Sequence, residues 1–447
     1  MSRRPVVVWI ASSVLLIGCN AIAGILAPKI VSVTVNLPAG LLVGDTAVAT
    51  AVALGDDHRD HGGRPRKWSS SDPTALSIDA NGKMVALAAR TVTITAEVDG
   101  TKGSATMGIA NDDNRFGYAL ADQPTAAGPY APDPAYRYNS SGGAVEITRT
   151  ATGIYSVRFA GLGRAPGQRD NVQVSGYNTT AVYCKPRVWD ASGADLLVDV
   201  SCFTFNAVAT DSRFTILALG ARAFGRTTPT AFALVVPDTG THILDSLATT
   251  RNSTGGNVIF GYVSEGAYAM DLKGLESAWA ASPVAIQLTP VGQGPRRCSV
   301  IAVDPSVAGL GISCTRPGGA VGDSPFSMLW LQRGRPSMRF GFAWTNNENS
   351  QADYAPDTHY ALNSSGGAIS ARRTGVGQYR IVFAGLARQP GATEIVLVSP
   401  PFLFGPPHIC DITSWGNSGA NDLAVTVSCF TVSGNPNNTR FDVVVLQ

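Results

Sequence analysis

The stretch GIYSVRFAGL at residues 153–162 recurs in this chain as GAYAMDLKGL at 266–275 and as GQYRIVFAGL at 377–386. In each copy large apolar residues occupy the third, fifth and seventh positions, and smaller or polar residues lie between them. A side-chain period of two residues predicts a β-strand with one buried face. The chain therefore repeats one strand-containing unit three times.

The repeat extends on both sides of this strand. An Asn-Ser-Ser/Thr-Gly-Gly segment precedes it, at 139–143, 252–256 and 363–367. A short apolar strand closes each copy, beginning at Phe214, Phe326 and Phe441. The 48 glycines and 27 prolines punctuate short segments, and no long stretch has the 3.6-residue apolar period of a helix. Each copy is predicted to be an all-β sandwich, and the second copy diverges most from the others.

The Asn-Ser-Ser-Gly-Gly segment has a faint similarity to the sequence around a serine-protease nucleophile. Such a serine needs a base within hydrogen-bond reach and an acid that orients the base. The second copy has Thr254 in place of the serine, and no histidine recurs in step with the segment. Asn and Gly are the residues that tight turns require. The segment therefore predicts a turn, no other catalytic motif is present, and we expect a protein that is not an enzyme.

Seven cysteines are present, and six of them lie inside the repeats. Neighbouring cysteines are 18, 16 and 19 residues apart, so a similar spacing recurs in every copy. This spacing predicts three disulfides within the repeats, Cys184–Cys202, Cys298–Cys314 and Cys410–Cys429. A metal site is the rival interpretation, but no Cys-x-x-Cys pair exists and no histidine accompanies the cysteines in every copy. No metal or cofactor is expected.

The seventh cysteine, Cys19, ends an apolar leader. Arg3 and Arg4 precede an uncharged run from Val6 to Ile17, which has the length and flanks of a secretory signal. The leader closes with Leu-Ile-Gly-Cys, which resembles the lipobox of bacterial lipoproteins. That resemblance implies cleavage before Cys19 and a lipid on its sulfur, which anchors the chain to a membrane. Asn20 follows, and we expect an outer-membrane or cell-surface location in the envelope.

The region 29–112 lacks cysteine and differs from the repeats. It contains Trp68-Ser-Ser-Ser-Asp-Pro, Asp79-Ala-Asn-Gly-Lys and Thr93-Ile-Thr-Ala-Glu-Val. These segments resemble the bacterial Ig-like group 2 family of surface proteins. The resemblance implies a seven-stranded sandwich with Trp68 in its core and a role in spacing or presenting other domains. The three repeats resemble a module of secreted bacterial proteins for which no activity is implied.

Trp189 and Trp415 provide the best hint of a ligand platform. Each lies five residues after the first cysteine of its copy, and an odd offset along a strand places two side chains on opposite faces. If the cysteines point inward, both indoles point outward, where they would stack on sugar rings. Packing inside the sandwich is the alternative interpretation, and the sequence favours it because Trp is mostly buried on average.

Charged and metal-ligating residues indicate no further partner. The Asp56–His61 segment combines carboxylates and imidazoles that would suit a divalent ion, but a solvated loop is the simpler interpretation. The Asn111–Asn114 segment is likewise interpreted as a polar linker rather than a calcium site. The formal net charge is +2, from 34 basic and 32 acidic residues, with no basic run. A nucleic-acid partner is not expected, since it demands a clustered cationic face.

The sequence thus predicts tandem β-sandwich domains, one Ig-like and three repeated and disulfide-containing. The expected boundaries are a signal peptide at 1–18, a lipidated linker at 19–28, the Ig-like domain at 29–112, and repeats at 113–219, 229–332 and 338–447. We expect these domains to form a rod that is anchored through lipid on Cys19. The expected role is adhesion to a glycan or a surface protein through the repeats. A structural spacer of the envelope without a small ligand is the alternative.

Overall fold

The computed structural model describes residues 28–38, 40–110, 113–191, 193–225, 228–333, 338–399 and 408–447. The predicted signal peptide at 1–18, the lipidation site Cys19 and the linker up to residue 27 lie outside the described residues. The described chain is almost entirely β-structure, which confirms the predicted all-β fold of tandem sandwich domains. Its helices are the 3₁₀ turn η1 (Pro134–Tyr136) and α2 (Glu276–Ala281). No described helix is long and apolar enough to cross a membrane.

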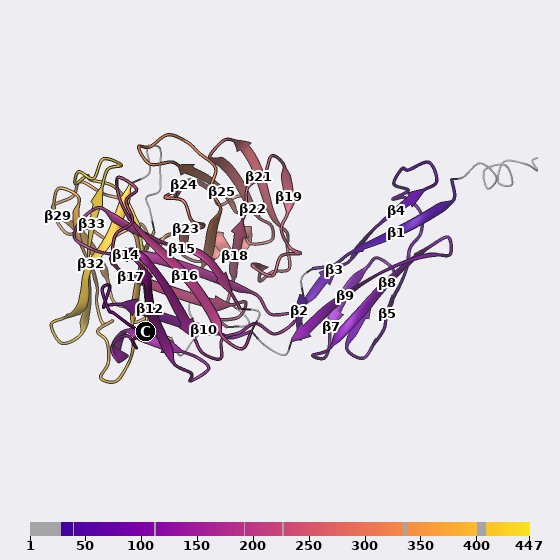
Figure 1. Ribbon diagram of the computed structural model, residues 1–447, viewed down its shortest axis with the longest axis horizontal. Helices are drawn as coiled ribbons and strands as arrows, with labels where there is room; N and C mark the ends of the chain where they lie inside the picture. Colours follow the sequence, from indigo (N-terminus) through magenta and orange to yellow (C-terminus); the bar gives the residue numbers. More distant parts are fainter. Residues whose placement is uncertain are drawn as a thin grey trace, which may run out of the picture.

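The N-terminal domain is elongated and extends from one end of a larger body (Figure 1). Its strands form sheets of two, four and three strands. They are β1 (Ile30–Asn36) with β4 (Thr50–Gly55); β2 (Gly40–Leu42), β9 (Thr101–Ala110), β8 (Thr91–Val98) and β5 (Lys67–Ser70); and β3 (Thr46–Val48), β7 (Lys83–Ala86) and β6 (Leu76–Ile78). Trp68 is half-buried and packs against both apolar clusters of this domain.

Each repeat is a sandwich of an inner and an outer sheet. The inner sheets are β11 (Arg137–Asn139), β10 (Phe116–Ala121), β17 (Arg213–Gly220) and β14 (Asp170–Tyr177) in module 1; β20 (Thr250–Asn252), β18 (Thr230–Val235), β26 (Phe326–Leu331) and β23 (Ala285–Pro290) in module 2; and β28 (Ala361–Asn363), β27 (Phe340–Trp344), β34 (Asp442–Leu446) and β31 (Ile395–Ser399) in module 3. The strand order is the same in all three, so the repeated sequence folds into a repeated topology.

The outer sheets carry the disulfides. They are β12 (Val145–Ala151), β13 (Ile154–Phe159), β16 (Leu196–Thr204) and β15 (Val182–Asp190) in module 1; β19 (Thr241–Ile243), β21 (Val258–Ser264), β22 (Ala267–Leu272), β25 (Gly309–Thr315) and β24 (Arg297–Asp304) in module 2; and β29 (Ile369–Gly375), β30 (Gln378–Phe383), β33 (Asp422–Phe430) and β32 (Ile409–Ser418) in module 3. The strands with the period-two pattern, β13, β22 and β30, lie inside these sheets and face the core of their own module.

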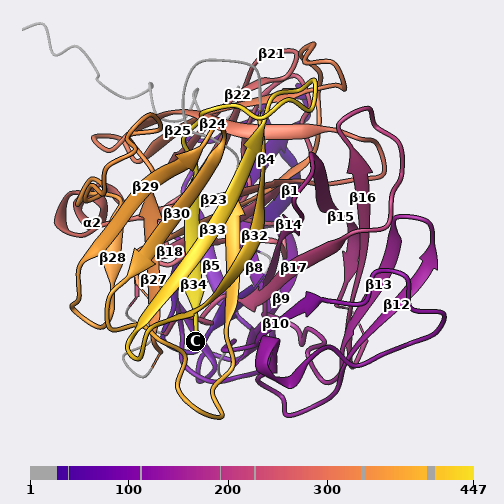
Figure 2. The same cartoon turned by 90° about the vertical axis from the view of Figure 1, so that its left-hand side faces the viewer.

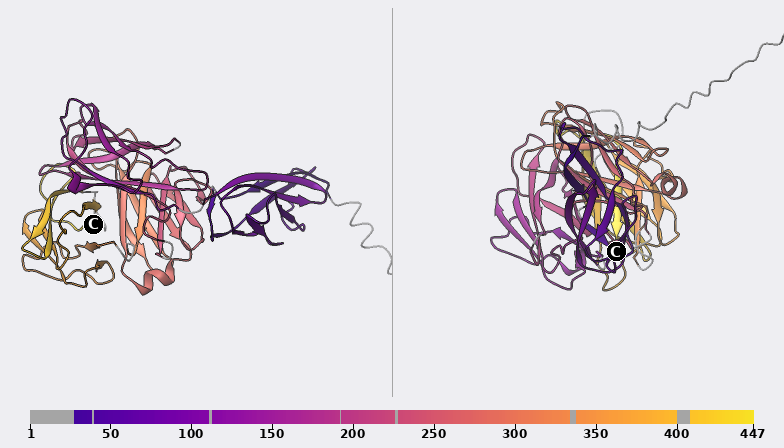
Figure 3. Two further views of the ribbon diagram at one scale, coloured as in Figure 1. Left: turned by 90° about the horizontal axis from the view of Figure 1, so that it is seen from below. Right: turned by 90° about the vertical axis from the view of Figure 1, so that its right-hand side faces the viewer.

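The three inner sheets are buried on both faces. In β10, Ala119 and Ala121 belong to the core of module 1, whereas Phe116, Tyr118 and Leu120 face the other way. That second face joins a single apolar cluster that the inner sheets of all three modules build together. We call this cluster the shared core. Figures 2 and 3 show the modules gathered around it, and we call this three-module body the head.

The predicted rod is therefore wrong for the repeats. Serial sandwiches in a rod would contact one another only at their ends, but here the closing strands β17, β26 and β34 all contribute to the shared core. β14 also pairs with β32 in parallel, which joins the inner sheet of module 1 to the outer sheet of module 3 in one eight-stranded sheet. The physical reason is burial: a strand that is apolar on both faces must be covered twice.

Three hydroxyls at equivalent positions of the repeat form hydrogen bonds between neighbouring modules around the shared core. Ser175 Oγ lies 2.9 Å from both the carbonyl oxygen and the amide nitrogen of Val398. The amide of Leu288 donates to Ser399 Oγ at 3.0 Å, and the amide of Val174 lies 3.4 Å from Thr289 Oγ1. Each hydroxyl thus bridges to the next module in a closed cycle, from module 1 to module 3, to module 2 and back to module 1.

A second cycle of backbone hydrogen bonds repeats this pattern. The amide at or directly before the first residue of β14, β23 and β31 donates to a loop carbonyl of the neighbouring module. The pairs are Asp170 to Ala248 at 3.2 Å, Val284 to His359 at 3.0 Å and Glu394 to Ala135 at 3.0 Å. The head is therefore a pseudo-trimer within one chain, in which three related modules use the same contact.

Candidate functional site

The three disulfides are Cys184–Cys202, Cys298–Cys314 and Cys410–Cys429, and each joins facing residues of two neighbouring strands. All six sulfurs lie in the cores of their own modules. Each bridge closes a loop of 16–19 residues, which stabilises the folded state by about 3 kcal/mol in the chain-entropy model. These bridges hold the outer sheets together and leave no thiol for chemistry there.

Trp189 and Trp415 do not form an outward platform. The strand register shifts between Pro186 and Val188 and again between Ile412 and Ser414, so each strand carries a β-bulge before its Trp. A bulge adds one residue, which turns an odd offset into an even one. Each Trp therefore lies on the same face as its cysteine, and the outward orientation inferred from simple alternation is wrong.

Both indoles pack inside the head. Trp189 packs against the core of module 1, and its Nε1 donates to Asp170 Oδ1 at 2.8 Å. Trp415 packs against the core of module 3 and the shared core. It also meets the rings of Tyr136 and Tyr177 edge-on, at 5.2 Å between centroids in each case. Trp415 therefore packs at the interface between modules 1 and 3.

The Asn-Ser-Ser/Thr-Gly-Gly segments form the turns that the sequence predicts. In module 2, Asn252 Oδ1 accepts from the amide and the hydroxyl of Thr254, at 3.1 and 2.8 Å, while Asn252 Nδ2 donates to Lys273 O at 2.9 Å. Gly255 has φ +77°, a conformation that glycine adopts without strain. The same contacts recur around Asn139 and Asn363. The hydroxyl of this segment thus maintains the turn.

The last glycine of this turn has no room for a side chain. A Cβ on Gly256 would lie 1.8 Å from the backbone oxygen of Lys273. We therefore expect Gly256→Ala to lower the free energy of unfolding by about 1–3 kcal/mol, seen as a lower Tm. Gly294→Ala is the matched control, because nothing lies within 4 Å of its Cβ position. An unchanged Tm for Gly256→Ala would contradict the close packing of this turn.

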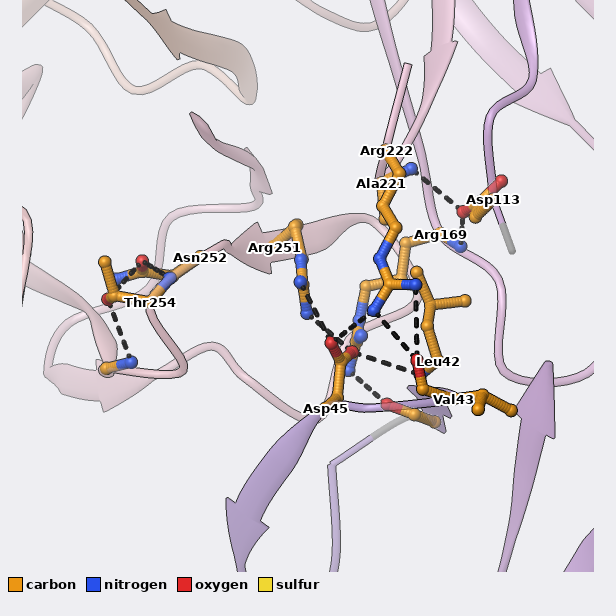
Figure 4. Close-up of polar contacts among 12 residues, drawn as sticks. Leu42, Val43, Asp45, Asp113, Arg169, Ala221, Arg222, Arg251, Asn252 and Thr254 are labelled. Carbon is orange, nitrogen blue, oxygen red and sulfur yellow. Dashed lines mark hydrogen bonds and ion pairs between the residues drawn. The ribbon is translucent and has the colours of Figure 1, made fainter. Parts of the chain in front are cut away.

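The N-terminal domain is joined to the head by a buried carboxylate, Asp45 (Figure 4). Arg222 Nη2 lies 2.7 Å from Asp45 Oδ1, and Arg251 Nη1 lies 3.0 Å from Asp45 Oδ2. The three side chains are at most 10% exposed. Burial alone would raise the pKa of Asp45, but Arg251, the amide of Leu42 and Arg222 together hold that pKa below its ordinary value. The carboxylate therefore stays charged between the two cations.

Close backbone contacts also join the N-terminal domain to the head. Arg169 Nη2 donates to Gly40 O at 2.7 Å, and a Cβ on Gly40 would lie 2.2 Å from the Cα of Gly167. Leu42 enters the shared core from the N-terminal domain. In the predicted linker, Asn111 and Asp112 lie outside the described residues, while Asp113 Oδ2 accepts from the amides of Arg169 and Ala221 at 2.7 and 2.9 Å. Asp113 thus acts as a structural anchor.

A surface groove of about 380 Å³ lies beside the first turn. Its lining is Ala131, Arg137, Tyr138, Asn139, Gly142, Gly143, Ala144 and Val145. Tyr138 is 42% exposed, and its ring stacks on Tyr118 at 5.7 Å between centroids. The groove combines an exposed aromatic ring, a guanidinium and the backbone groups of a turn, and its volume lies in the range of small-ligand sites.

In the other modules, the residues equivalent to Tyr138 make different contacts. Tyr138 pairs with Tyr118 across the inner sheet, and in the same register Arg251 pairs with Phe232 and Leu362 with Phe342. Arg251 binds Asp45 of the N-terminal domain, and Leu362 packs against the shared core. Among the described residues, therefore, only module 1 presents an exposed aromatic ring at this place.

The histidines do not gather into a metal centre. His61 Nε2 lies 3.0 Å from Asp57 Oδ1 in an exposed loop of the N-terminal domain, and His359 Nδ1 lies 2.9 Å from Asp357 Oδ1. Within the described ranges, no group of three His, Cys, Asp or Glu side chains is placed to hold a metal ion.

Sequence reasoning missed Tyr138, Asp45 and Arg251. Alignment of the repeats around the Asn-Ser-Ser/Thr-Gly-Gly segments would have revealed that the residue directly before the Asn is Tyr, Arg and Leu in the three copies. No signal of this kind marks Asp45, because its partners come from the second module and from the segment before it. Among protein-family models none matches this chain, and the curated proteins include no similar one.

Proposed function

We propose that this protein is an exported lipoprotein of the cell envelope that binds a glycan or a surface protein through its head. In this proposal Cys19 carries the lipid, and the N-terminal domain, an Ig-like module, is the stalk between membrane and head. The stalk is joined to the head by buried charge and by close backbone contact at Asp45 and Gly40, which supports a fixed presentation of the head.

The observation that carries the binding role is the groove at Tyr138. An aromatic ring that remains 42% exposed beside a guanidinium and a polar turn is suited to stack on a sugar ring or to receive a side chain of a protein. Since the equivalent positions in modules 2 and 3 are occupied by contacts within the chain, the proposed binding is by one site per molecule. It does not gain avidity from the three copies.

A structural spacer of the envelope is the second candidate. The partial burial of Trp189 and Trp415 favours it, because the candidate platform residues pack against the cores, as the favoured interpretation of the sequence expected. A spacer needs stable, disulfide-linked domains and no ligand.

Binding of the purified protein to glycans, envelope polysaccharides and matrix proteins tests the proposal. We expect saturable binding that Tyr138→Ala weakens at least about 30-fold, as for a central aromatic contact. Val376→Ala is the control, since Val376 is 59% exposed on module 3, and its affinity should be unchanged. Binding that Tyr138→Ala leaves intact would contradict the groove. A folded protein that binds nothing would favour the spacer.

A further inference from the structure

A second cavity, of about 40 Å³, lies where the three modules converge. β14 begins beside the N-terminal domain, where Arg169 contacts Gly40, and runs toward the cavity, which Val174, Ser175 and Gly176 line. The cavity therefore lies toward the end of the head that faces away from the stalk. It is large enough for more than one water molecule, which needs about 10–15 Å³.

All three modules line this cavity with equivalent residues. The first cysteine of each disulfide, Cys184, Cys298 and Cys410, contributes to it. The residues directly before these cysteines, which share one slot of the repeat, are Tyr183, Arg297 and Ile409. The lining of the cavity therefore includes polar side chains, whereas the shared core is apolar.

Arg297 is buried in this lining with unused hydrogen-bond donors. It is 3% exposed, and its Nη2 donates to Phe205 O at 2.7 Å. Its Nε and Nη1 have no hydrogen-bond partner of good geometry among the described residues, and neither has the hydroxyl of Tyr183. Arg297 Cζ lies 4.8 Å from the centroid of the Tyr183 ring, and the guanidinium, by its charge and by a side-chain hydrogen bond, limits the rise that burial causes in the pKa of Tyr183. A buried guanidinium with unsatisfied N–H groups is costly, so an acceptor in the cavity would stabilise it.

Basic residues that are adjacent in sequence to the lining also have no carboxylate partner among the described ion pairs. Lys185, which follows Cys184, is fully buried, and its Nζ donates to Gly292 O at 2.7 Å. Burial, together with Arg296 and Arg187, lowers the pKa of Lys185 to about 7. Among the described ion pairs, none involves Lys185, Arg187, Arg296 or Arg297. Basic residues without a carboxylate partner among the described ion pairs therefore flank the lining in sequence.

The remaining titratable groups of the lining do not cancel this charge. Asp411 is 1% exposed, and neither of its oxygens has a side-chain or backbone partner of good hydrogen-bond geometry. Burial raises the pKa of Asp411 well above its ordinary value, although a backbone contact with Val182 opposes that rise, so burial disfavours the charged carboxylate. Burial also lowers the pKa of His408, which disfavours its charged form. Arg297 is thus the basic side chain of the lining.

We propose that the cavity binds one small monovalent anion, of the size of a halide or a carboxylate group, between the Arg297 guanidinium and the Tyr183 hydroxyl. The anion supplies the acceptor that these donors lack. Because the lining comes from all three modules, binding favours the assembled head. This site does not depend on the proposed function of the groove.

Thermal unfolding of the full-length protein tests the site. Chloride, bromide or formate replaces the larger gluconate ion at constant ionic strength. We expect a saturable rise in Tm of about 2–4 °C, which Arg297→Gln abolishes and Tyr183→Phe moves to higher anion concentration. Arg158→Gln is the control, since Arg158 lies 46% exposed on module 1, and it should retain the rise. Chloride acting without formate, or the reverse, distinguishes a halide from a carboxylate.

Two results would overturn the proposal. One is a wild-type Tm that does not saturate with any of these anions, and the other is a rise that persists in Arg297→Gln. If Arg297→Gln fails to fold, bromide-soaked crystals of the wild-type protein decide the question by anomalous scattering. We expect a bromide peak within hydrogen-bond distance of Arg297 Nε or Nη1, and a cavity without bromide would contradict the site.

Discussion

Phe232→Ala is expected to destabilise the whole head, although Phe232 belongs to module 2. Phe232 is fully buried in the shared core, which the inner sheets of all three modules build. Truncating such a ring costs about 3–5 kcal/mol of unfolding free energy. We expect the Tm of the head to fall by on the order of 10 °C, with a single calorimetric transition for the three modules in both proteins.

The control is Val236→Ala, one residue after the same strand. Val236 is 69% exposed, so its truncation should change the free energy of unfolding by less than about 0.5 kcal/mol. If the modules unfolded independently, Phe232→Ala would move only part of the unfolding enthalpy to lower temperature. Splitting of the transition into separate steps would contradict the shared core as the source of cooperativity.

Asp45→Ala is expected to release the N-terminal domain from its fixed position on the head. The substitution removes the carboxylate that Arg222 and Arg251 share in a buried site, and breaking such a pair costs about 3–5 kcal/mol. Small-angle X-ray scattering should show a larger and less uniform particle. Asp99→Ala is the control, because Asp99 lies 50% exposed in the N-terminal domain and pairs only with Arg64 among the described ion pairs.

Acid should reproduce the effect of Asp45→Ala in the wild-type protein. The folded-state pKa of Asp45 lies below its ordinary value of 3.8, so the unfolded state binds more protons as pH falls. The stabilisation is complete above the unfolded pKa and is lost as pH falls through the folded pKa. Asp45→Asn should remove this component of the acid dependence. An unchanged scattering profile for Asp45→Ala would contradict the role of the Asp45 ion pairs in holding the N-terminal domain on the head.

Local patterns in the sequence predict much of the fold. The period-two strands became β13, β22 and β30, the Asn-Ser-Ser/Thr-Gly-Gly segments became turns, and the cysteine spacing matched the three bridges. These features depend on residues close together along the chain, where side-chain period and turn chemistry leave few alternatives.

The orientation of Trp189 and Trp415 shows where such reasoning fails. Alternation assigns faces correctly only along an uninterrupted strand, and the bulge after each first cysteine shifts the count by one. Pro186 is a residue that strands accept only at an edge or a bulge, but nothing in the sequence around Ile412 marks a bulge, and only the pairing with the facing strand shows both. Alternation alone was therefore insufficient to separate packing from a ligand platform.

The sequence by itself determined the units of this protein: all-β modules, three related copies, and the cysteine pairs within them. Only the tertiary structure decided that the copies close into a head around one core, that Asp45 joins the N-terminal domain to the head, and that Arg297 lines a cavity between modules. The physical reason is that strand and turn formation depend on neighbours in sequence. The second buried face of an inner sheet and the partner of a buried charge come from parts of the chain far away.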